Sequence, residues 1–150
     1  MQDEGVQLSL FDGVGGGRRA LDMLGLSVAV YAASETDPEA CRVVRYAWPD
    51  VVELGDVTKL TAQDIAKIRD QAPHVRWVLL FAGAPCVDLT RLSADRQGLA
   101  GVRSGLFFEI KRVKSLVKEV FSAEVEVFDL IENVSSMTAE DRDTMSEHMA

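Results

Sequence analysis

Short apolar runs alternate with segments of helical patterning along almost the whole chain, and this alternation predicts the secondary structure. Five apolar runs predict strands, at residues 6–11, 27–33, 51–54, 77–82 and 125–131. Five other segments predict helices, at residues 18–24, 38–46, 62–70, 106–121 and 138–149. Three of these helices have capping signals: Asp37 before Pro38, Thr61 ahead of Asp64, and Thr138. Strands that alternate with helices form βαβ units, so we expect an α/β fold with a Rossmann-like, mostly parallel sheet.

Size and composition limit the class of protein. The chain has 150 residues, 47% apolar and 27% charged, as in a soluble globular protein of one domain. No stretch approaches the roughly 18 consecutive apolar residues of a membrane span. The N-terminal segment is acidic, so we expect neither export nor organelle import, and a nuclear location in a eukaryote or a cytoplasmic one otherwise. The two cysteines, Cys41 and Cys86, provide no disulfide framework, and no metal site is predicted.

A glycine cluster follows the first predicted strand. Residues 11–17 read Phe-Asp-Gly-Val-Gly-Gly-Gly, and such a loop lets a ligand approach the backbone at the carboxyl end of the strands. Glu35 follows the second strand about 20 residues later, where an acid can bind a pair of ribose hydroxyls. On these features alone, a dinucleotide site and a plain tight turn are equally expected.

A third acid follows the third predicted strand, in the sequence Gly-Asp-Val at residues 55–57. The Asp56 carboxylate can accept a hydrogen bond from an adenine amino group, although by itself Asp56 is an ordinary turn residue. Acid-bearing loops at three successive strand ends favour an adenosine-containing ligand over three unrelated turns.

The strongest chemical signal is the sequence Gly-Ala-Pro-Cys at residues 83–86, directly after the apolar run at 77–82. Proline lacks an N–H and restricts the residue before it, so the strand must end here, with Cys86 at the carboxyl edge of the sheet. A cysteine in that place can be a nucleophile where positive charge favours its thiolate. Cys41, in mid-helix, is expected to be a small buried hydrophobe. Near Cys86 in the sequence, the residues that could supply this positive charge are Arg91, Arg96 and Arg103.

Glu132 leaves the sheet one strand later, in the sequence Leu-Ile-Glu-Asn-Val at residues 130–134. It is expected at the same edge as Cys86, where desolvation can keep a carboxyl group partly protonated so that it donates to a ring nitrogen. A strand-end acid that caps the next turn is the ordinary alternative, and the neighbouring cysteine loop favours the catalytic one.

Six sequence elements follow one another along the chain: LSLFDGVGGG, SETDP, GDV, GAPCVDLT, GLAGVRSGLFFEI and ENVSSM. In this order they resemble the early motifs of the cytosine-C5 DNA methyltransferases. The segment from Cys86 to Glu109 is most similar to the de novo type of animal enzyme. A Rossmann-like pattern alone would not place a Pro-Cys loop ahead of Glu-Asn-Val on the next strand.

The resemblance implies a role for each matched residue. Cys86 would attack C6 of a cytosine flipped out of the duplex, and Glu132 would hydrogen-bond its N3 and exocyclic amine. Pro85 would shape the nucleophile loop and Asn133 would steady it. The cofactor implied is S-adenosyl-L-methionine, with Glu35 on the ribose and Asp56 on the adenine. Its full set of contacts would be Phe11, Asp12, Gly13, Gly15, Glu35, Asp56, Val57 and Leu106, and the DNA contacts would be Arg91, Arg103 and Ser104.

A complete member of the family would continue well beyond residue 150. It would supply a strand whose arginine assists Glu132, a target-recognition region, and a closing helix that completes the cofactor pocket. The chain is therefore expected to be a partial catalytic domain over residues 1–150, with about five of the family's seven strands. The fifth strand is expected to expose apolar surface, which a missing C-terminal segment or a second subunit would cover.

The formal net charge of −8 is unusual for a protein that binds DNA. The stretch from Cys86 to Lys118 is basic, which is compatible with DNA lying over it and equally with a solvated helix after a polar loop. The stretch from Glu119 to Ala150 is strongly acidic, so this chain alone is expected to have poor DNA affinity.

The leading functional hypothesis is methylation of cytosine C5 in DNA. The same chemistry on transfer RNA is a close variant. A non-catalytic relative that binds cofactor or a partner and regulates an active methyltransferase is the alternative from another class. A nucleotide-dependent oxidoreductase is the weakest reading, because it leaves the Pro-Cys loop and Glu132 unexplained.

Overall fold

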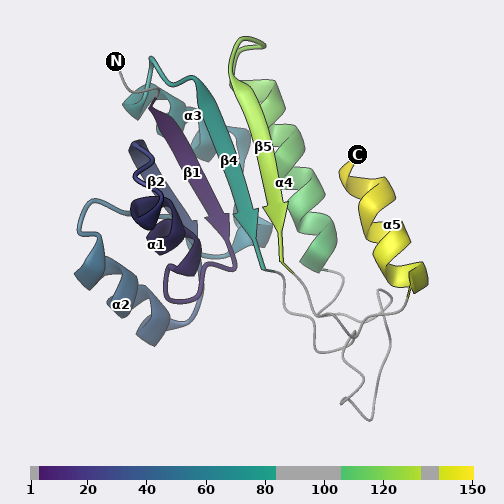
Figure 1. Cartoon of the computed structure of the whole chain (residues 1–150), viewed down its shortest axis with the longest axis horizontal. Helices are drawn as coiled ribbons and strands as arrows, with labels where there is room; N and C mark the ends of the chain where they lie inside the picture. Colours follow the sequence, from purple (N-terminus) through teal and green to yellow (C-terminus); the bar gives the residue numbers. More distant parts are fainter. Residues whose placement is uncertain (1–3, 84–105, 133–138) are drawn as a thin grey trace.

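A computed structural model of the chain describes residues 4–83, 106–132 and 139–150. Its strands form a single sheet in the order β3-β2-β1-β4-β5, and each neighbouring pair is parallel. Figure 1 shows β2, β1, β4 and β5 of this sheet. The predicted α/β class with a Rossmann-like sheet is confirmed, and every predicted strand is found, the third one shortened. The strands are β1 (Gly5–Leu10), β2 (Val28–Ser34), β3 (Val52–Glu53), β4 (Trp77–Ala82) and β5 (Glu126–Ile131).

The helices begin where the sequence provides caps. Asp37 accepts hydrogen bonds from the backbone N–H groups of Glu39 and Ala40, and Thr61 and Asp64 form a complete capping box. Thr138 lies outside the described residues. One short element was not predicted, a 3-10 helix after Asp56, because three residues are too few to produce a periodic pattern. The helices are α1 (Gly16–Met23), α2 (Pro38–Ala47), η1 (Val57–Lys59), α3 (Ala62–Gln71), α4 (Phe107–Val120) and α5 (Ala139–Met149).

The central strand β1 is buried along its whole length. Its alternate side chains Val6, Leu8 and Leu10 belong to the main apolar core, together with side chains of α3 and α4. Full burial of a leucine side chain stabilises a fold by roughly 1.5–3 kcal/mol, so this row fixes the register of the strand. The alternate residues Gln7 and Ser9 are also fully buried. Helices α1 and α2 cover one face of the sheet (Figure 1).

The last strand, β5, forms an edge of the sheet among the described residues and pairs with β4. Val127 and Ile131 pack against the core, and Asp129 forms an ion pair with Lys114 of α4 at 2.7 Å. Phe128 and Leu130 are each 51% exposed. The predicted exposure of apolar surface on the fifth strand is therefore confirmed.

Because all five strands run the same way, their carboxyl ends lie at one edge of the sheet, and the loops that leave this edge build the site. None of the helices within 4–83, 106–132 and 139–150 is long and apolar enough to cross a membrane.

Candidate functional site

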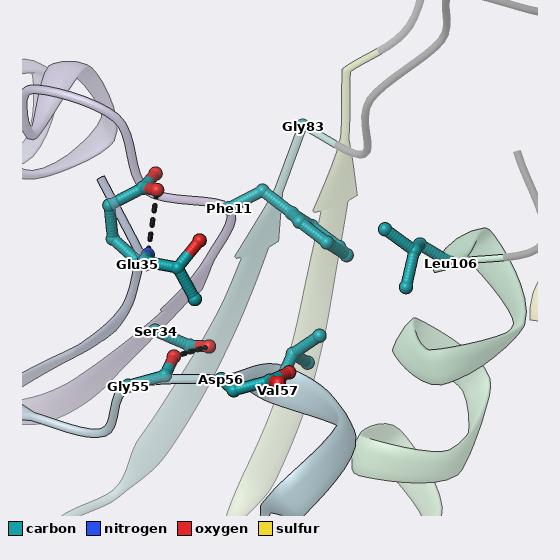
Figure 2. Close-up of a pocket in the computed structure, with 9 residues that line it drawn as sticks. Phe11, Ser34, Glu35, Gly55, Asp56, Val57, Gly83 and Leu106 are labelled. Atoms are coloured by element: carbon teal, nitrogen blue, oxygen red, sulfur yellow. Dashed lines mark hydrogen bonds between the residues drawn. The ribbon is translucent and has the colours of Figure 1, made fainter. Parts of the chain in front are cut away.

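A pocket of about 290 Å³ opens at the carboxyl edge of the sheet (Figure 2). This volume is close to the lower limit of small-molecule sites, roughly 300 Å³. Five residues predicted from sequence to bind a cofactor line it, although they come from four separate segments of the chain. The complete lining is Phe11, Ser34, Glu35, Thr36, Gly55, Asp56, Val57, Gly83 and Leu106.

Phe11 follows β1 with a φ of 54°, in the left-handed region that bulky residues rarely occupy. Its ring points across the pocket toward Leu106 at the start of α4 (Figure 2). Backbone strain of this kind costs on the order of 1–3 kcal/mol and concentrates at ligand sites. The strain therefore supports the placement of Phe11 in a binding site.

The other residues of the glycine loop that were predicted to bind the cofactor do not line the pocket but support the loop. Among the described residues, the pocket lining does not include Asp12, Gly13 or Gly15. Gly15 has a φ of 82°, and a Cβ there would fall 2.5 Å from the Trp48 ring, so only glycine fits.

Asp12 is buried beneath this loop, and its Oδ2 accepts a hydrogen bond from the Tyr31 hydroxyl. Burial raises the pKa of Asp12, and the hydrogen bond from Tyr31 opposes that rise. Burial, together with the same hydrogen bond, raises the pKa of Tyr31 far above its usual value, so Tyr31 stays a hydrogen-bond donor. The Oδ1 atom of Asp12 is buried with no hydrogen-bond partner among the described residues.

Glu35 connects two loops of the pocket. Its Oε2 accepts from the Gly13 N–H at 2.7 Å, and its Oε1 accepts from the N–H groups of Thr36 at 2.8 Å and Asp37 at 3.0 Å. A carboxylate has about four acceptor positions, so about one remains for a ligand hydroxyl. Glu35 is thus both a clasp for the glycine loop and a candidate ligand for a ribose.

Asp56 lines the same pocket and is the N-cap of η1. Its Oδ1 accepts from the N–H and the hydroxyl of Thr58 at 2.9 and 2.8 Å. These bonds hold the pKa of Asp56 below its usual value, so the group is ionised at neutral pH. Its second oxygen is a candidate acceptor for a ligand amino group.

Four pocket residues were missed by sequence reasoning: Ser34, Thr36, Gly55 and Gly83. The Ser34 hydroxyl donates to the Gly55 carbonyl at 2.7 Å and so joins the end of β2 to the turn before η1 (Figure 2). A small polar residue next to Glu35 at a strand end was the available signal for Ser34.

Glu132 lies beside the first residue of the Gly-Ala-Pro-Cys sequence. Its backbone N–H donates to the Ala82 carbonyl at 2.8 Å, which continues the pairing of β4 with β5. A Cβ on Gly83 would lie 3.0 Å from Glu132 Oε2. The Glu132 side chain is exposed, so the described residues do not supply the desolvation that the sequence led us to expect.

Several predicted site residues lie outside the described residues: Pro85, Cys86, Arg91, Arg96, Arg103, Ser104 and Asn133. Cys41 is described, and it is half-buried on α2 with its thiol 3.6 Å from the Glu35 carbonyl oxygen. The prediction that Cys41 is a small buried hydrophobe is therefore confirmed only in part, and burial raises the pKa of its thiol, which disfavours the thiolate.

The family model of the C-5 cytosine-specific DNA methylases matches residues 6–150. The chain belongs to this family. It is 31% identical over 118 residues to the DNA (cytosine-5)-methyltransferase DRM1 of Arabidopsis thaliana, covering 74% of this chain and 19% of that relative. It is 27% identical over 139 residues to the type II methyltransferase M.NlaIV of Neisseria lactamica, covering 90% of this chain and 29% of that relative. Both relatives are thus several times longer than the matched region.

Among solved structures, a DNMT2 mutant of Spodoptera frugiperda matches with a TM-score of 0.64 at 22% identity. The match covers 96% of this chain and 40% of that one. At this identity the likeness supports the fold alone. The resemblance deduced from the six sequence elements is confirmed at the level of the family.

Proposed function

We propose that the chain is the cofactor-binding and nucleophile-bearing portion of an enzyme that transfers a methyl group from S-adenosyl-L-methionine to C5 of cytosine in DNA. The observation that carries this proposal is the convergence of Phe11, Glu35, Asp56 and Leu106 on one pocket. Family membership directs the interpretation toward a methyl donor rather than the dinucleotide of an oxidoreductase.

The residues of the pocket fit an adenosyl group. An adenine amino group is a donor and Asp56 offers an ionised acceptor, while Glu35 has about one acceptor position left for a ribose hydroxyl. Phe11, Val57 and Leu106 supply apolar walls for the base and the chain that follows it. When bound, S-adenosyl-L-methionine would supply the electrophilic methyl group.

The proposed chemistry at the cytosine uses Cys86 and Glu132. The Cys86 thiolate adds to C6 and forms an S–C6 bond, while Glu132 hydrogen-bonds N3 and the exocyclic amine and so stabilises the ring charge. The electron pair released to C5 would accept the methyl group that S-adenosyl-L-methionine supplies when it is bound, with S-adenosyl-L-homocysteine as the second product. A base then removes the C5 proton, and the S–C6 bond breaks to return the thiolate.

Glu132 is exposed at the sheet edge, so a base that lies over it would provide the desolvation that the proposed hydrogen bond requires. Pro85 and Asn133 would hold the nucleophile loop, and Arg91, Arg103 and Ser104 would contact the DNA. This part of the proposal is supported by the family match and by the position of Glu132 next to Gly83.

Recognition of a target DNA sequence would require a further protein segment, either a C-terminal continuation or a second subunit. Phe128 and Leu130 on β5 form an apolar face that such a segment would cover. The short matched span, 19% of the Arabidopsis relative and 29% of the Neisseria one, also supports this requirement.

Calorimetric titration with S-adenosylmethionine and S-adenosylhomocysteine tests the cofactor site. The wild type is expected to bind both, and Asp56→Ala is expected to weaken binding about tenfold or more through loss of the acceptor. Asp64→Ala is the matched control, because Asp64 is also a capping carboxylate but does not line the pocket. A wild type that is folded by circular dichroism yet binds neither compound would overturn the proposed cofactor site.

The alternative of a non-catalytic regulator is favoured by the same exposed face on β5, since a partner-binding module also needs such a surface. Cys86→Ser in a complex reconstituted with a segment bearing the missing motifs separates the two. Loss of methyl transfer would support the enzyme, and unaltered transfer would support the regulator.

A further inference from the structure

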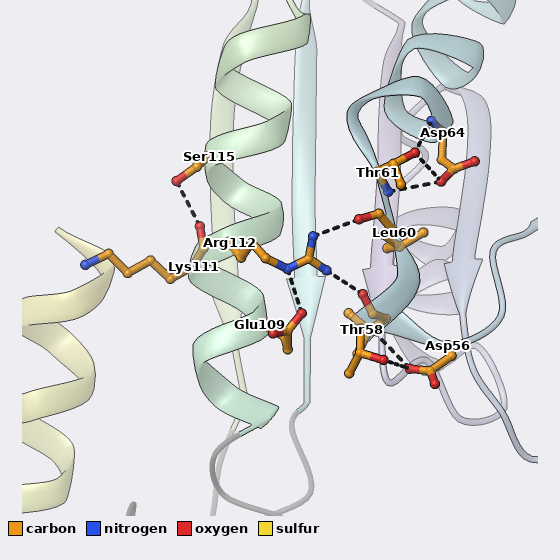
Figure 3. Close-up of polar contacts among 10 residues, drawn as sticks. Asp56, Thr58, Leu60, Thr61, Asp64, Glu109, Lys111, Arg112 and Ser115 are labelled. Carbon is orange, nitrogen blue, oxygen red and sulfur yellow. Dashed lines mark hydrogen bonds and ion pairs between the residues drawn. The ribbon is translucent and has the colours of Figure 1, made fainter.

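Arg112 of α4 joins its helix to η1, the element that carries Val57 of the pocket (Figure 3). Its Nη2 donates to the Val57 carbonyl and its Nη1 donates to the Leu60 carbonyl, both at 2.7 Å. Its Nε donates to Glu109 Oε2, also at 2.7 Å, which orients the guanidinium from its own helix. All three nitrogens of the fork are therefore engaged.

These contacts complete the support of a very short helix. The last carbonyls of a helix lack partners within it, and at the C-cap of η1 the Leu60 carbonyl is bonded by Arg112. Arg112 also bonds the Val57 carbonyl, which already accepts from the Leu60 N–H at 3.3 Å. At the other end, Asp56 accepts from Thr58. A three-residue helix has little stability of its own, so its position depends on these two side chains together with the burial of Val57 and Leu60 in the main core.

The same helix α4 contributes Leu106, at its N-cap, to the pocket that Val57 also lines. The fork of Arg112 thus helps to set how far η1 lies from α4, and with it how Asp56 and Val57 are placed relative to Leu106. A lysine could not reproduce this arrangement, because its ammonium group is a single point charge without a planar fork.

We propose that Arg112 is a positioning residue for the adenine end of the cofactor: by bonding the Val57 and Leu60 carbonyls, it holds η1 so that Asp56 meets the adenine amino group. This inference rests on the proposed function, since it assumes that an adenosyl ligand occupies the pocket. Arg112 does not line the pocket among the described residues, so its action on the ligand is indirect.

The test compares S-adenosylhomocysteine with S-inosylhomocysteine, in which a carbonyl replaces the adenine amino group. The wild type is expected to prefer the adenine compound, because Asp56 would face a second acceptor in the inosine compound. In Arg112→Met the dissociation constant of S-adenosylhomocysteine is expected to rise about tenfold. The ratio of the dissociation constant of the inosine compound to that of the adenine compound is expected to fall toward one. Arg112→Lys is expected to recover only part of the preference.

Arg69→Met is the matched control. Arg69 of α3 donates to the Val120 carbonyl at the far end of α4, at 3.3 Å, so it also bonds the backbone of a neighbouring element but away from the pocket. Its loss is expected to lower stability while leaving both the affinity and the base preference within about twofold of the wild type.

Two failures remain distinct in this design. A wild type that binds neither compound defeats the proposed function, and the role of Arg112 with it. A wild type that binds and discriminates, together with an Arg112→Met variant that keeps both affinity and preference, defeats the role of Arg112 alone. Equal loss of preference in Arg69→Met would show a general effect of stability and would also overturn the proposal.

Discussion

Gly83 and Glu132 face each other across the carboxyl ends of β4 and β5, where a Cβ on Gly83 would lie 3.0 Å from Glu132 Oε2. In the sequence, Gly83 directly precedes Ala-Pro-Cys, so this proximity places the proposed catalytic carboxylate beside the residue with which that motif begins. The backbone bond from the Glu132 N–H to the Ala82 carbonyl keeps the two strand ends in register.

The double-mutant cycle of Gly83→Ala with Glu132→Ala tests the proximity of Gly83 to the Glu132 carboxylate. Gly83→Ala is expected to lower the free energy of unfolding in urea more in the wild-type background than in the Glu132→Ala background. The expected coupling energy is about 0.5–1 kcal/mol. Gly16→Ala is the control, because a Cβ at Gly16 meets no atom within 4 Å. Additive free energies of unfolding would contradict the contact.

Glu35→Gln should weaken both the hydrogen bonds that hold the glycine loop and the binding of the ligand. The amide can present its oxygen to Gly13 or to Thr36 but not to both, so a donor then faces a donor. We expect a loss of about 1–2 kcal/mol in unfolding free energy and a clear loss of S-adenosylhomocysteine affinity. Glu39→Gln is the control, because the Glu39 side chain is exposed on α2.

The 2′-deoxyribose analogue of S-adenosylhomocysteine then separates the two roles of Glu35. If Glu35 acts only as the clasp, the substitution weakens both ligands equally. If it also bonds the 2′-hydroxyl, the deoxy compound loses less affinity than the parent compound.

Tyr31→Phe should make stability fall more steeply with pH. The ring stays in its edge contact with Trp48, but buried Asp12 loses a donor that lowers its pKa, and this pKa therefore rises further. A carboxyl group with a raised pKa stabilises the fold below its unfolded pKa, about 3.9, and loses that contribution as pH rises through the folded value. We expect Tyr31→Phe to cost about 1–3 kcal/mol at pH 7 and less at pH 4.

Urea unfolding of Tyr31→Phe and wild type across this pH range checks the expectation. Tyr46→Phe, whose side chain is on the exposed side of α2, is expected to match the wild type at both pH values. A difference between Tyr31→Phe and wild type that does not change with pH would argue against coupling to Asp12.

Phe128→Ser with Leu130→Ser should reduce self-association of the chain. Both side chains are 51% exposed on β5, so the fold loses only part of the apolar burial that a core position would lose. We expect sedimentation velocity to show less oligomer, with secondary structure unchanged. Val127→Ser, on the core face of the same strand, should lower stability without this effect. If the double variant still self-associates, a surface other than Phe128 and Leu130 drives the association.

The sequence by itself determined the succession of strands and helices, because periodicity and caps such as Asp37–Pro38 and Thr61–Asp64 depend on residues close together along the chain. It also predicted that Phe11, Glu35 and Asp56 belong to one site, because parallel strands bring their carboxyl ends to one edge. The family could be deduced for a similar reason, since its motifs are local runs of residues that keep their order.

Only the tertiary structure decided which distant groups meet. Arg112 bonds carbonyls 52 and 55 residues earlier in the chain, and Glu35 bonds the N–H of a residue 22 positions before it. No local pattern specifies such pairs, because side-chain packing and strand order set the distances between them. The same reason explains why Asp12 proved to be a buried support rather than part of the pocket wall, and why Glu132 is exposed beside Gly83.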